Sequence, residues 1–226
     1  MEKNIRNGKM CEWAVLACFL LAAVWFFCPI GQPEGKSVLF AMRLALPAIV
    51  LALGSLWLRP KWIMMAFWFC ALGDAMGVLG SFEGQMGGFA LAHICYVSYF
   101  LKCIRQGRMQ SKALTVTTLL SLIPLIVAAF KVIPAVPLLP IRVGCVIYAL
   151  LLIGTMWTSM MRAFAAPVGE RMLSSVAALG GILFLVSDFV LSWNKFTSHI
   201  PQASILIMST YYAALLFLFV GTAKKL

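Results

Sequence analysis

The chain has 226 residues, of which 63% are hydrophobic and 11% are charged, whereas soluble domains are about half apolar and about a quarter charged. This composition excludes a soluble globular protein and predicts an all-α, polytopic membrane protein that forms one integral membrane domain over residues 1–226. The net charge of +11 comes from basic residues scattered among short connecting stretches, as is usual at membrane edges, so no nucleic-acid partner is expected.

Eight apolar runs have about the length of a spanning helix, which needs roughly 20 residues. The first follows Lys3, Arg6 and Lys9 and has the outline of a signal peptide. No small-x-small cleavage motif closes it, so we interpret it as a retained first helix. The eight runs cover about 13–28, 37–58, 62–80, 86–104, 113–133, 138–161, 172–193 and 201–222.

The distribution of Lys and Arg predicts the orientation of these helices. One set of connections carries 13 of these residues and the other set carries 5. Cytoplasmic connections hold the excess of positive charge, so we expect both termini in the cytoplasm. We assign the chain to a bacterial inner, or plasma, membrane as a multi-pass protein.

The third and fourth runs hold one carboxylate and one imidazole, Asp74 and His93. Ionisable groups at membrane depth are costly, so each is a hypothesis for a functional site. Gly73, Gly77 and Gly80 share one face of the third helix, which permits close approach of another helix.

A second aspartate repeats the first pattern. In both places a small residue precedes the aspartate and a phenylalanine follows eight positions later: Asp74 with Phe82, and Asp188 with Phe196. The third and seventh helices run in the same direction, so a parallel repeat of four helices each would place the two aspartates across a central cavity. The half-repeats would be 1–112 and 113–226.

The predicted orientation places three polar groups at a common depth. Asp74 and Asp188 lie about six residues from the non-cytoplasmic helix end, and His93 lies about seven residues into the fourth helix. At ~1.5 Å rise per residue, all three sit ~8–11 Å below that edge. One polar pocket is therefore expected. When the two half-repeats are aligned with one inserted residue, Tyr211 in the eighth helix matches Tyr96 in the fourth.

Several stretches resemble the YhhN family of membrane proteins over nearly the whole chain: ALGD near Asp74, GFALAHICYVSYF, GGILFLVSDFVLSWNKF and IMSTYYAALL, with VIYALLLIGTMW fitting the sixth helix. The motif F-x-x-x-H-x-x-Y falls on Phe89, His93 and Tyr96. The chain departs from the family pattern at Gln85, where a glycine is expected, and at Leu215, where many members have glutamine. Eukaryotic members of the family are lysoplasmalogenases.

The resemblance implies hydrolysis of the vinyl ether of a lysoplasmalogen to a fatty aldehyde and a glycerophospho-alcohol. A vinyl ether is stable to base but is hydrolysed by acid, because protonation of its carbon gives an oxocarbenium ion. Such a site needs a general acid and negative charge beside the cation, as in glycosidases. We therefore expect Asp74 and Asp188 to divide these roles in either order, with His93 orienting a carboxylate or moving protons.

The resemblance also implies substrate-binding residues. Tyr96 and Tyr211 are expected to line the pocket, and Arg43, Arg142 and Lys195, at the outer helix ends, to hold the phosphate. The expected partners are a lysophospholipid substrate and membrane lipids. No cofactor and no metal site is assigned.

Other readings of the same residues stay open. A zinc site of His93, Asp74 and Asp188 is one alternative, although two histidines are too few for a three-histidine catalytic site. A proton- or ion-coupled transporter of a small molecule or lipid would use the same intramembrane charges. In an accessory membrane protein the aspartates would only tie helices together, the tyrosines would pack, and the cations would snorkel to the interface.

Overall fold

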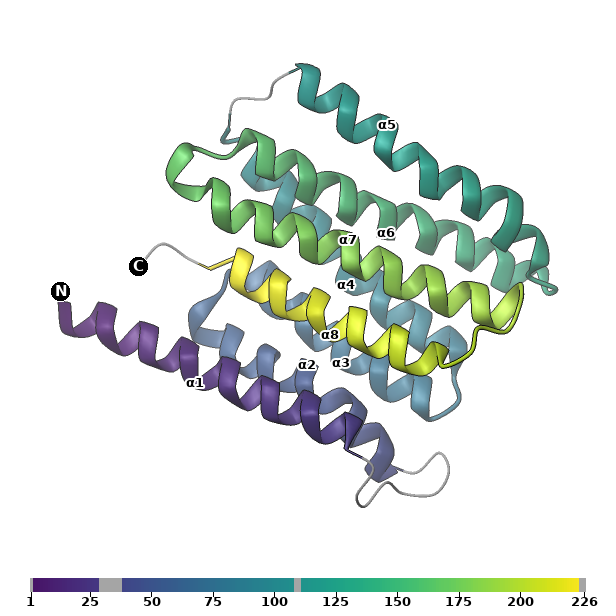
Figure 1. Cartoon of the computed structure of the whole chain (residues 1–226), viewed down its shortest axis with the longest axis horizontal. Coiled ribbons are helices and arrows are strands. Elements are labelled where there is room, and N and C mark those ends of the chain that lie inside the picture. The colour runs from purple at the N-terminus through teal and green to yellow at the C-terminus, as the bar shows by residue number, and fades with distance from the viewer. Residues whose placement is uncertain (1, 29–37, 108–110, 224–226) are drawn as a thin grey trace. The chain divides into compact units, whose positions relative to one another are not determined.

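The computed structural model describes residues 2–28, 38–107 and 111–223, and within these ranges the ordered elements are helices. Eight segments of the described chain are long and apolar enough to cross a membrane, which confirms the predicted all-α, multi-pass architecture (Figure 1). The elements are α1 (Glu2–Phe27), α2 (Val38–Leu58), α3 (Lys61–Val78), α4 (Phe82–Ile104), α5 (Ser111–Val127), η1 (Ala128–Val132), η2 (Ile133–Ala135), α6 (Leu139–Ala165), α7 (Val168–Phe196) and α8 (Ala203–Gly221).

Several helices extend beyond the apolar runs that predicted them. The seventh run begins near residue 172 and ends near 193, whereas α7 begins at Val168 and ends at Phe196. Its first turn carries Glu170, whose carboxylate pairs with Arg162 near the end of α6. Hydropathy marks only the part of a helix that lies in hydrocarbon, so polar first and last turns lie outside the predicted limits.

The chain divides into two compact units, one of Met1–Cys95 with Thr222–Leu226 and the other of Tyr96–Gly221. The helix α4 is continuous from the first unit into the second. The half-repeats 1–112 and 113–226 and the cytoplasmic termini stay predictions.

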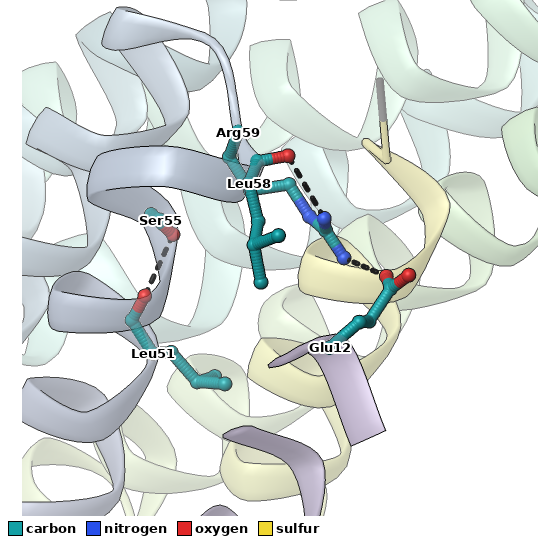
Figure 2. A network of polar contacts seen from close by, with 5 residues as sticks. All are labelled: Glu12, Leu51, Ser55, Leu58 and Arg59. Atoms are coloured by element: carbon teal, nitrogen blue, oxygen red, sulfur yellow. Dashed lines mark hydrogen bonds and ion pairs between the residues drawn. The ribbon is translucent and has the colours of Figure 1, made fainter. Parts of the chain in front are cut away.

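In the first unit, two arginines tie α2 to α1, one within α2 and one directly after its last residue. The latter is Arg59, whose guanidinium pairs with the Glu12 carboxylate and donates to the Leu58 carbonyl at 2.9 Å (Figure 2). Further along α2, Gly54 allows close contact, because a methyl group there would lie 2.6 Å from the Val15 side chain. These contacts fix α1 along α2, and Figure 1 shows the two helices side by side.

At the other end, Arg43 caps α1. Its Nε donates to the Trp25 carbonyl at 3.0 Å, and its Nη2 donates to the carbonyls of Trp25 and Cys28, the latter at 2.7 Å. The guanidinium also lies 4.7 Å from the centroid of the Trp25 ring. A helix C-terminus leaves carbonyls without intrahelical donors and carries partial negative charge, so a buried cation is stabilised there.

A three-residue turn joins α3 to α4. Gly80, with φ of +91°, ends α3 in a Schellman motif, in which its N–H reaches the Gly77 carbonyl at 3.2 Å and the Ser81 N–H reaches the Met76 carbonyl at 3.0 Å. The Ser81 hydroxyl then caps α4 by accepting the Gly84 N–H at 3.1 Å. Gly80 therefore serves the turn, whereas the prediction placed it with Gly73 and Gly77 on a packing face.

Glycines bring α3 and α4 into backbone contact. A methyl group at Gly88 would lie 2.7 Å from the Gly73 nitrogen, and one at Gly77 would lie 2.6 Å from the Gln85 side chain. The predicted close approach along Gly73 and Gly77 is confirmed. Gln85, the departure from the family pattern, packs its amide over Gly77.

In the second unit, α7 lies between α6 and α8, and Figure 1 shows α6 and α7 side by side. Small residues again set the distances. A methyl group at Gly221 would lie 2.3 Å from the Ala177 nitrogen, and one at Gly181 would lie 2.5 Å from the Ser159 hydroxyl. Small residues at such crossings let backbones approach in a bilayer, where close packing stabilises helix pairs.

Candidate active site

Asp188 lies in the interior of the second unit and is bound by a phenol. It belongs to α7, and only 4% of its surface is exposed. The Tyr148 hydroxyl, on the neighbouring helix α6, donates to its Oδ2. A buried carboxylate needs such donors, because an unpaired charge in an apolar interior is costly. The hydrogen bond therefore holds this carboxylate at a defined place between two helices.

Ser187 attaches the α7 turn that carries Asp188 to the neighbouring helix α8. Its hydroxyl donates to the Ile207 carbonyl of α8 at 3.0 Å and is also buried. Successive residues of an α-helix point about 100° apart, so Ser187 contacts α8 while Asp188 contacts α6. The Ser-Asp pair thus connects α7 to both of its neighbours.

Three buried aromatic rings lie one helical turn before Asp188. Phe184 makes edge-to-face contacts with Tyr96, at 6.5 Å between ring centroids, and with Tyr211, at 5.4 Å. All three side chains are almost fully buried. The structure therefore brings Tyr96 and Tyr211, two of the predicted substrate-binding residues, into contact with one ring of α7 near Asp188.

Asp74 and His93 belong to the first unit, and both are buried. Asp74 follows Gly73, where a methyl group would lie 3.1 Å from the Phe89 ring. Phe89, His93 and Tyr96 lie four and three residues apart along α4, which puts them on one helix face. The motif thus packs its phenylalanine against the aspartate-bearing turn of α3 and carries its histidine one turn further.

The helix ends do not test the common depth expected from the sequence. Asp74 lies four residues before the end of α3, Asp188 lies eight before the end of α7, and His93 lies eleven after the start of α4. A helix end is not the membrane edge, because polar turns extend beyond the hydrocarbon. That the two aspartates and the histidine form one pocket stays a prediction.

The three cations expected at the phosphate have different surroundings. Arg43 is buried against the carbonyls at the end of α1. Arg142, in the first turn of α6, donates to the Val136 carbonyl through Nε at 2.9 Å and Nη2 at 2.6 Å. Lys195, in the last turn of α7, is exposed, and its ammonium lies 5.8 Å from the centroid of the Phe196 ring. Their phosphate roles stay predictions.

Two residues of this site were not singled out from the sequence, Tyr148 and Phe184. A single tyrosine in an apolar run resembles a packing residue, so Tyr148 served only to place the sixth helix. The predicted runs gave no signal of the Tyr148–Asp188 contact, since they place Tyr148 ten residues after a start at 138 and Asp188 five before an end at 193. In the structure, Tyr148 lies nine residues after the start of α6 and Asp188 lies eight before the end of α7. In adjacent antiparallel helices, such counts place the two side chains at the same level.

The arrangement can stabilise positive charge and transfer protons. Asp188 supplies an acceptor oxygen in a nearly dry setting, where electrostatic interactions are stronger than in water. The aromatic rings present negative faces that attract cations. Among the described residues, no group of three or more His, Cys, Asp or Glu side chains is placed to hold a metal ion.

Comparisons with known proteins agree with the motifs. The chain is 29% identical over 231 residues to Lysoplasmalogenase TMEM86B of Homo sapiens, covering 98% of this chain and 91% of that protein. It is 28% identical to the Mus musculus protein of the same name, covering 93% and 85%. It is also 31% identical over 160 residues to Lysoplasmalogenase TMEM86A of Bos taurus, covering 67% and 61%.

No solved structure matches the chain. The model of the YhhN family matches residues 36–222, which include every helix from α2 to α8. The resemblance carried by the aspartate motifs and by F-x-x-x-H-x-x-Y is therefore confirmed, and the chain belongs to the YhhN family.

Proposed function

We propose that this membrane protein hydrolyses the vinyl ether of lysoplasmalogens and releases a fatty aldehyde and a glycerophosphoethanolamine or glycerophosphocholine. The observation that carries the proposal is the buried Tyr148–Asp188 hydrogen bond beside an aromatic cluster. The names of the similar proteins supply the substrate class. The site supplies what the chemistry of that substrate requires.

The reaction begins with transfer of a proton to the vinyl carbon that does not bear oxygen. The electron pair of the double bond forms the new C–H bond, and the neighbouring carbon and oxygen share the positive charge of an oxocarbenium ion. Water adds to that carbon and loses a proton, which gives a hemiacetal. The hemiacetal hydroxyl then loses its proton and forms the aldehyde carbonyl while the bond to the glycerol oxygen breaks. The glycerol oxygen takes up a proton, and the aldehyde is released.

Within this proposal Asp188 is the carboxylate that stabilises the oxocarbenium ion and orients the attacking water. The Tyr148 hydroxyl donates a hydrogen bond to Oδ2 and so holds this carboxylate in one orientation. The faces of Phe184 and Tyr211 add attraction for a cation. Preorganised charge of this kind, placed where charge develops, commonly contributes more than any other effect to enzymatic rate enhancement.

Asp74 is then the proposed proton donor, because the reaction needs an acid as well as a carboxylate. Asp74 is buried and follows Gly73, where α3 and α4 are in backbone contact. His93 is proposed to return the proton to it after each turnover. These assignments rest on the repeated aspartate motif and on the division of roles between two carboxylates that such chemistry requires.

The test is aldehyde release from a lysoplasmalogen by purified protein in detergent. We expect release by the wild type and a loss of at least about 100-fold in Asp188→Asn and in Asp74→Asn, the range of general acid–base catalysis. Glu83→Gln, an exposed change at the start of α4, is the control and keeps full activity. Each variant is first checked for an unchanged elution volume and thermal midpoint.

Two results contradict the proposal in different ways. Release that survives both aspartate changes keeps the activity and rejects the carboxylate mechanism. No release by the wild type, with pH and headgroup varied, rejects the activity itself. In that case, proton- or ion-coupled flux into liposomes that depends on Asp188 would favour the transporter.

A further inference from the structure

One face of α7 carries both the candidate site and a cation. Phe184, Asp188 and Lys195 are spaced by four and seven residues, and these spacings return a helix to the same face. The rise from Asp188 to Lys195 is about 10 Å at ~1.5 Å per residue. Lys195 lies in the last turn of α7 and is exposed, so the face runs from the buried site to the helix end.

The packing of α7 on α6 indicates which neighbouring helix this face of α7 meets. Tyr148 lies on α6, and the residues before it lead toward the start of that helix. Asp188 is hydrogen-bonded to Tyr148. The Lys195 charge therefore lies over the same α6–α7 seam as the carboxylate, further toward the helix end.

The other two cations expected at the phosphate are directed elsewhere. Arg43 donates to carbonyls at the end of α1, in the other compact unit of the chain. Arg142 directs two of its nitrogens to the Val136 carbonyl. Of the three, Lys195 is the one on the helix face of the Tyr148–Asp188 pair.

The spacing fits the substrate of the proposed reaction. In a lysoplasmalogen, six bonds separate the carbon that becomes cationic from the phosphorus, which is about the length of two extended residues, or ~7 Å. The rise of about 10 Å between Asp188 and Lys195 exceeds this length by about 3 Å. The carboxylate can therefore lie beside that carbon while the long lysine side chain reaches the phosphate.

We propose that Lys195 binds the phosphate of the substrate and thereby sets its direction along α7. The inference rests on the proposed hydrolysis at Asp188. It places the headgroup at the C-terminal end of α7 and directs the alkenyl chain past Phe184 toward the middle of the helix. It also makes Lys195 a determinant of specificity, because a lipid without phosphate loses this contact.

A purely structural role for Lys195 has different consequences. A cation in the last turn of a helix interacts favourably with the helix dipole, and a long side chain snorkels to the membrane interface. Either role affects the stability of α7 but treats all ligands alike. The discriminating quantity is therefore the difference between ligands with and without phosphate.

The experiment measures binding of two uncleavable ligands to the protein in lipid nanodiscs by calorimetric titration. One is a saturated 1-O-alkyl lysophospholipid, and the other is the corresponding 1-O-alkylglycerol, which has no phosphate. Lys195→Met should weaken binding of the lysophospholipid about tenfold, the equivalent of one charge-assisted contact, and leave the alkylglycerol unchanged. Lys195→Arg should restore most of the affinity, and Lys131→Met, an exposed lysine of η1, should have no effect.

The kinetic counterpart uses cleavable substrates. With a lysoplasmalogen, Lys195→Met should raise KM about tenfold and change kcat little, because the contact is equal in the ground and transition states. With an alkenylglycerol, neither constant should change. Equal losses for both substrates, or no loss for either, overturn the phosphate site.

Failure of the phosphate site and failure of the proposed reaction give different results. Aldehyde release that depends on Asp188 but not on Lys195 keeps the reaction and rejects the phosphate site. Lysophospholipid binding that depends on Lys195, without aldehyde release from any alkenyl substrate, keeps the phosphate site and rejects the reaction. A wild type that binds neither uncleavable ligand overturns the phosphate site.

Discussion

At the scale of single residues, the Tyr148–Asp188 pair shows how a carboxylate is kept in an apolar interior. The phenol satisfies one carboxylate oxygen without adding a second charge. It also fixes the side-chain rotamer of Asp188, since Tyr148 belongs to a different helix. A rigid carboxylate is what a short-lived cation needs, because the site has no time to reorganise around it.

The first prediction concerns Tyr148. We expect Tyr148→Phe to lower kcat for aldehyde release by about 10- to 100-fold, which is less than Asp188→Asn, because the carboxylate remains but loses its orienting donor. In the Asp188→Asn background the same change should have little further effect, since residues that act as a unit are not additive. Tyr99→Phe on α4 is the matched control.

An additive loss in the double variant would contradict this prediction. It would mean that Tyr148 acts independently of Asp188, for example through packing. A fall in the thermal midpoint of Tyr148→Phe that accounts for its lost activity would also indicate a packing role for Tyr148.

The sequence located the charged residues of the site more readily than their neighbours. Asp74, Asp188 and His93 stood out because an ionisable group in an apolar run is costly and needs a reason. Tyr148 and Phe184 did not stand out, because both residue types are compatible with lipid and with packing. The roles of the Tyr148 phenol and the Phe184 ring depend on which residues they contact on neighbouring helices, and the sequence does not show how the helices pair.

At the scale of helices, small residues decide where the carboxylates sit. Gly88 and Gly73 let α3 and α4 touch through their backbones beside Asp74. The sequence predicted this face from Gly73 and Gly77 but included Gly80, which ends the helix with a positive φ. Periodicity alone does not distinguish a packing glycine from a capping glycine, because both fall at helical spacing near a helix end.

The second prediction compares two adjacent glycines of α4. A methyl group at Gly88 would lie 2.7 Å from backbone of Gly73, whereas one at Gly87 meets nothing within 4 Å. We expect Gly88→Ala to destabilise the protein by about 1–3 kcal/mol through overpacking and to lower aldehyde release by moving Asp74. Gly87→Ala should leave the thermal midpoint unchanged or slightly higher, since alanine favours a helix by roughly 0.5–1 kcal/mol over glycine.

Thermal midpoints in detergent and aldehyde release, measured together on the two variants, check the prediction. If Gly88→Ala is as stable and as active as Gly87→Ala, the backbone contact of α3 with α4 does not hold. Asp74 would then lack the rigid support that its proposed role requires.

The third prediction concerns the ion pair that ties α1 to α2. The Arg59 side chain is 2% exposed and that of Glu12 is 25% exposed. Glu12→Gln removes the carboxylate that pairs with a buried guanidinium, whereas Arg59→Met leaves a carboxylate that water can reach. We expect Glu12→Gln to cost about 3 kcal/mol, near the lower end for a broken buried pair, and Arg59→Met to cost about 1 kcal/mol, as for a largely solvated pair.

The measurement is reversible unfolding of each variant in mixed detergent micelles. The double variant Glu12→Gln/Arg59→Met should recover most of the loss of Glu12→Gln, because no charge is then left without a partner. A larger cost for Arg59→Met than for Glu12→Gln would show that packing of the arginine stem outweighs its charge.

At the scale of the whole molecule, the sequence predicted the number of helices and the structure added their pairing. Hydropathy identified all eight spans because each must be apolar over about 20 residues. It contained no information on which helix lies beside which, so the seam of α6 and α7 that holds Tyr148 and Asp188 was not foreseen. The orientation of the helices in the membrane is inferred from the Lys and Arg residues on the connections, 13 on one side and 5 on the other. This orientation stays a prediction.

The fourth prediction tests that orientation across α7. In a variant whose seven cysteines are replaced by serine or alanine, a single cysteine is introduced at His199 or at Gly169, which are both exposed and lie at opposite ends of α7. The helix is about 43 Å long at ~1.5 Å per residue and so reaches across the membrane. The positive-inside bias predicts that a membrane-impermeant maleimide labels His199→Cys in intact cells and labels Gly169→Cys only after permeabilisation.

The outcome also determines the side from which a substrate headgroup reaches Lys195. Lys195 lies in the turn of α7 next to His199, so labelling of His199→Cys from outside places the proposed phosphate contact at the non-cytoplasmic surface. The reverse pattern, with Gly169→Cys labelled in intact cells, would invert the topology and place that contact in the cytoplasm. Labelling of both positions in intact cells would contradict a membrane-spanning α7, and with it the membrane depth of Asp188 on which its proposed catalytic role depends.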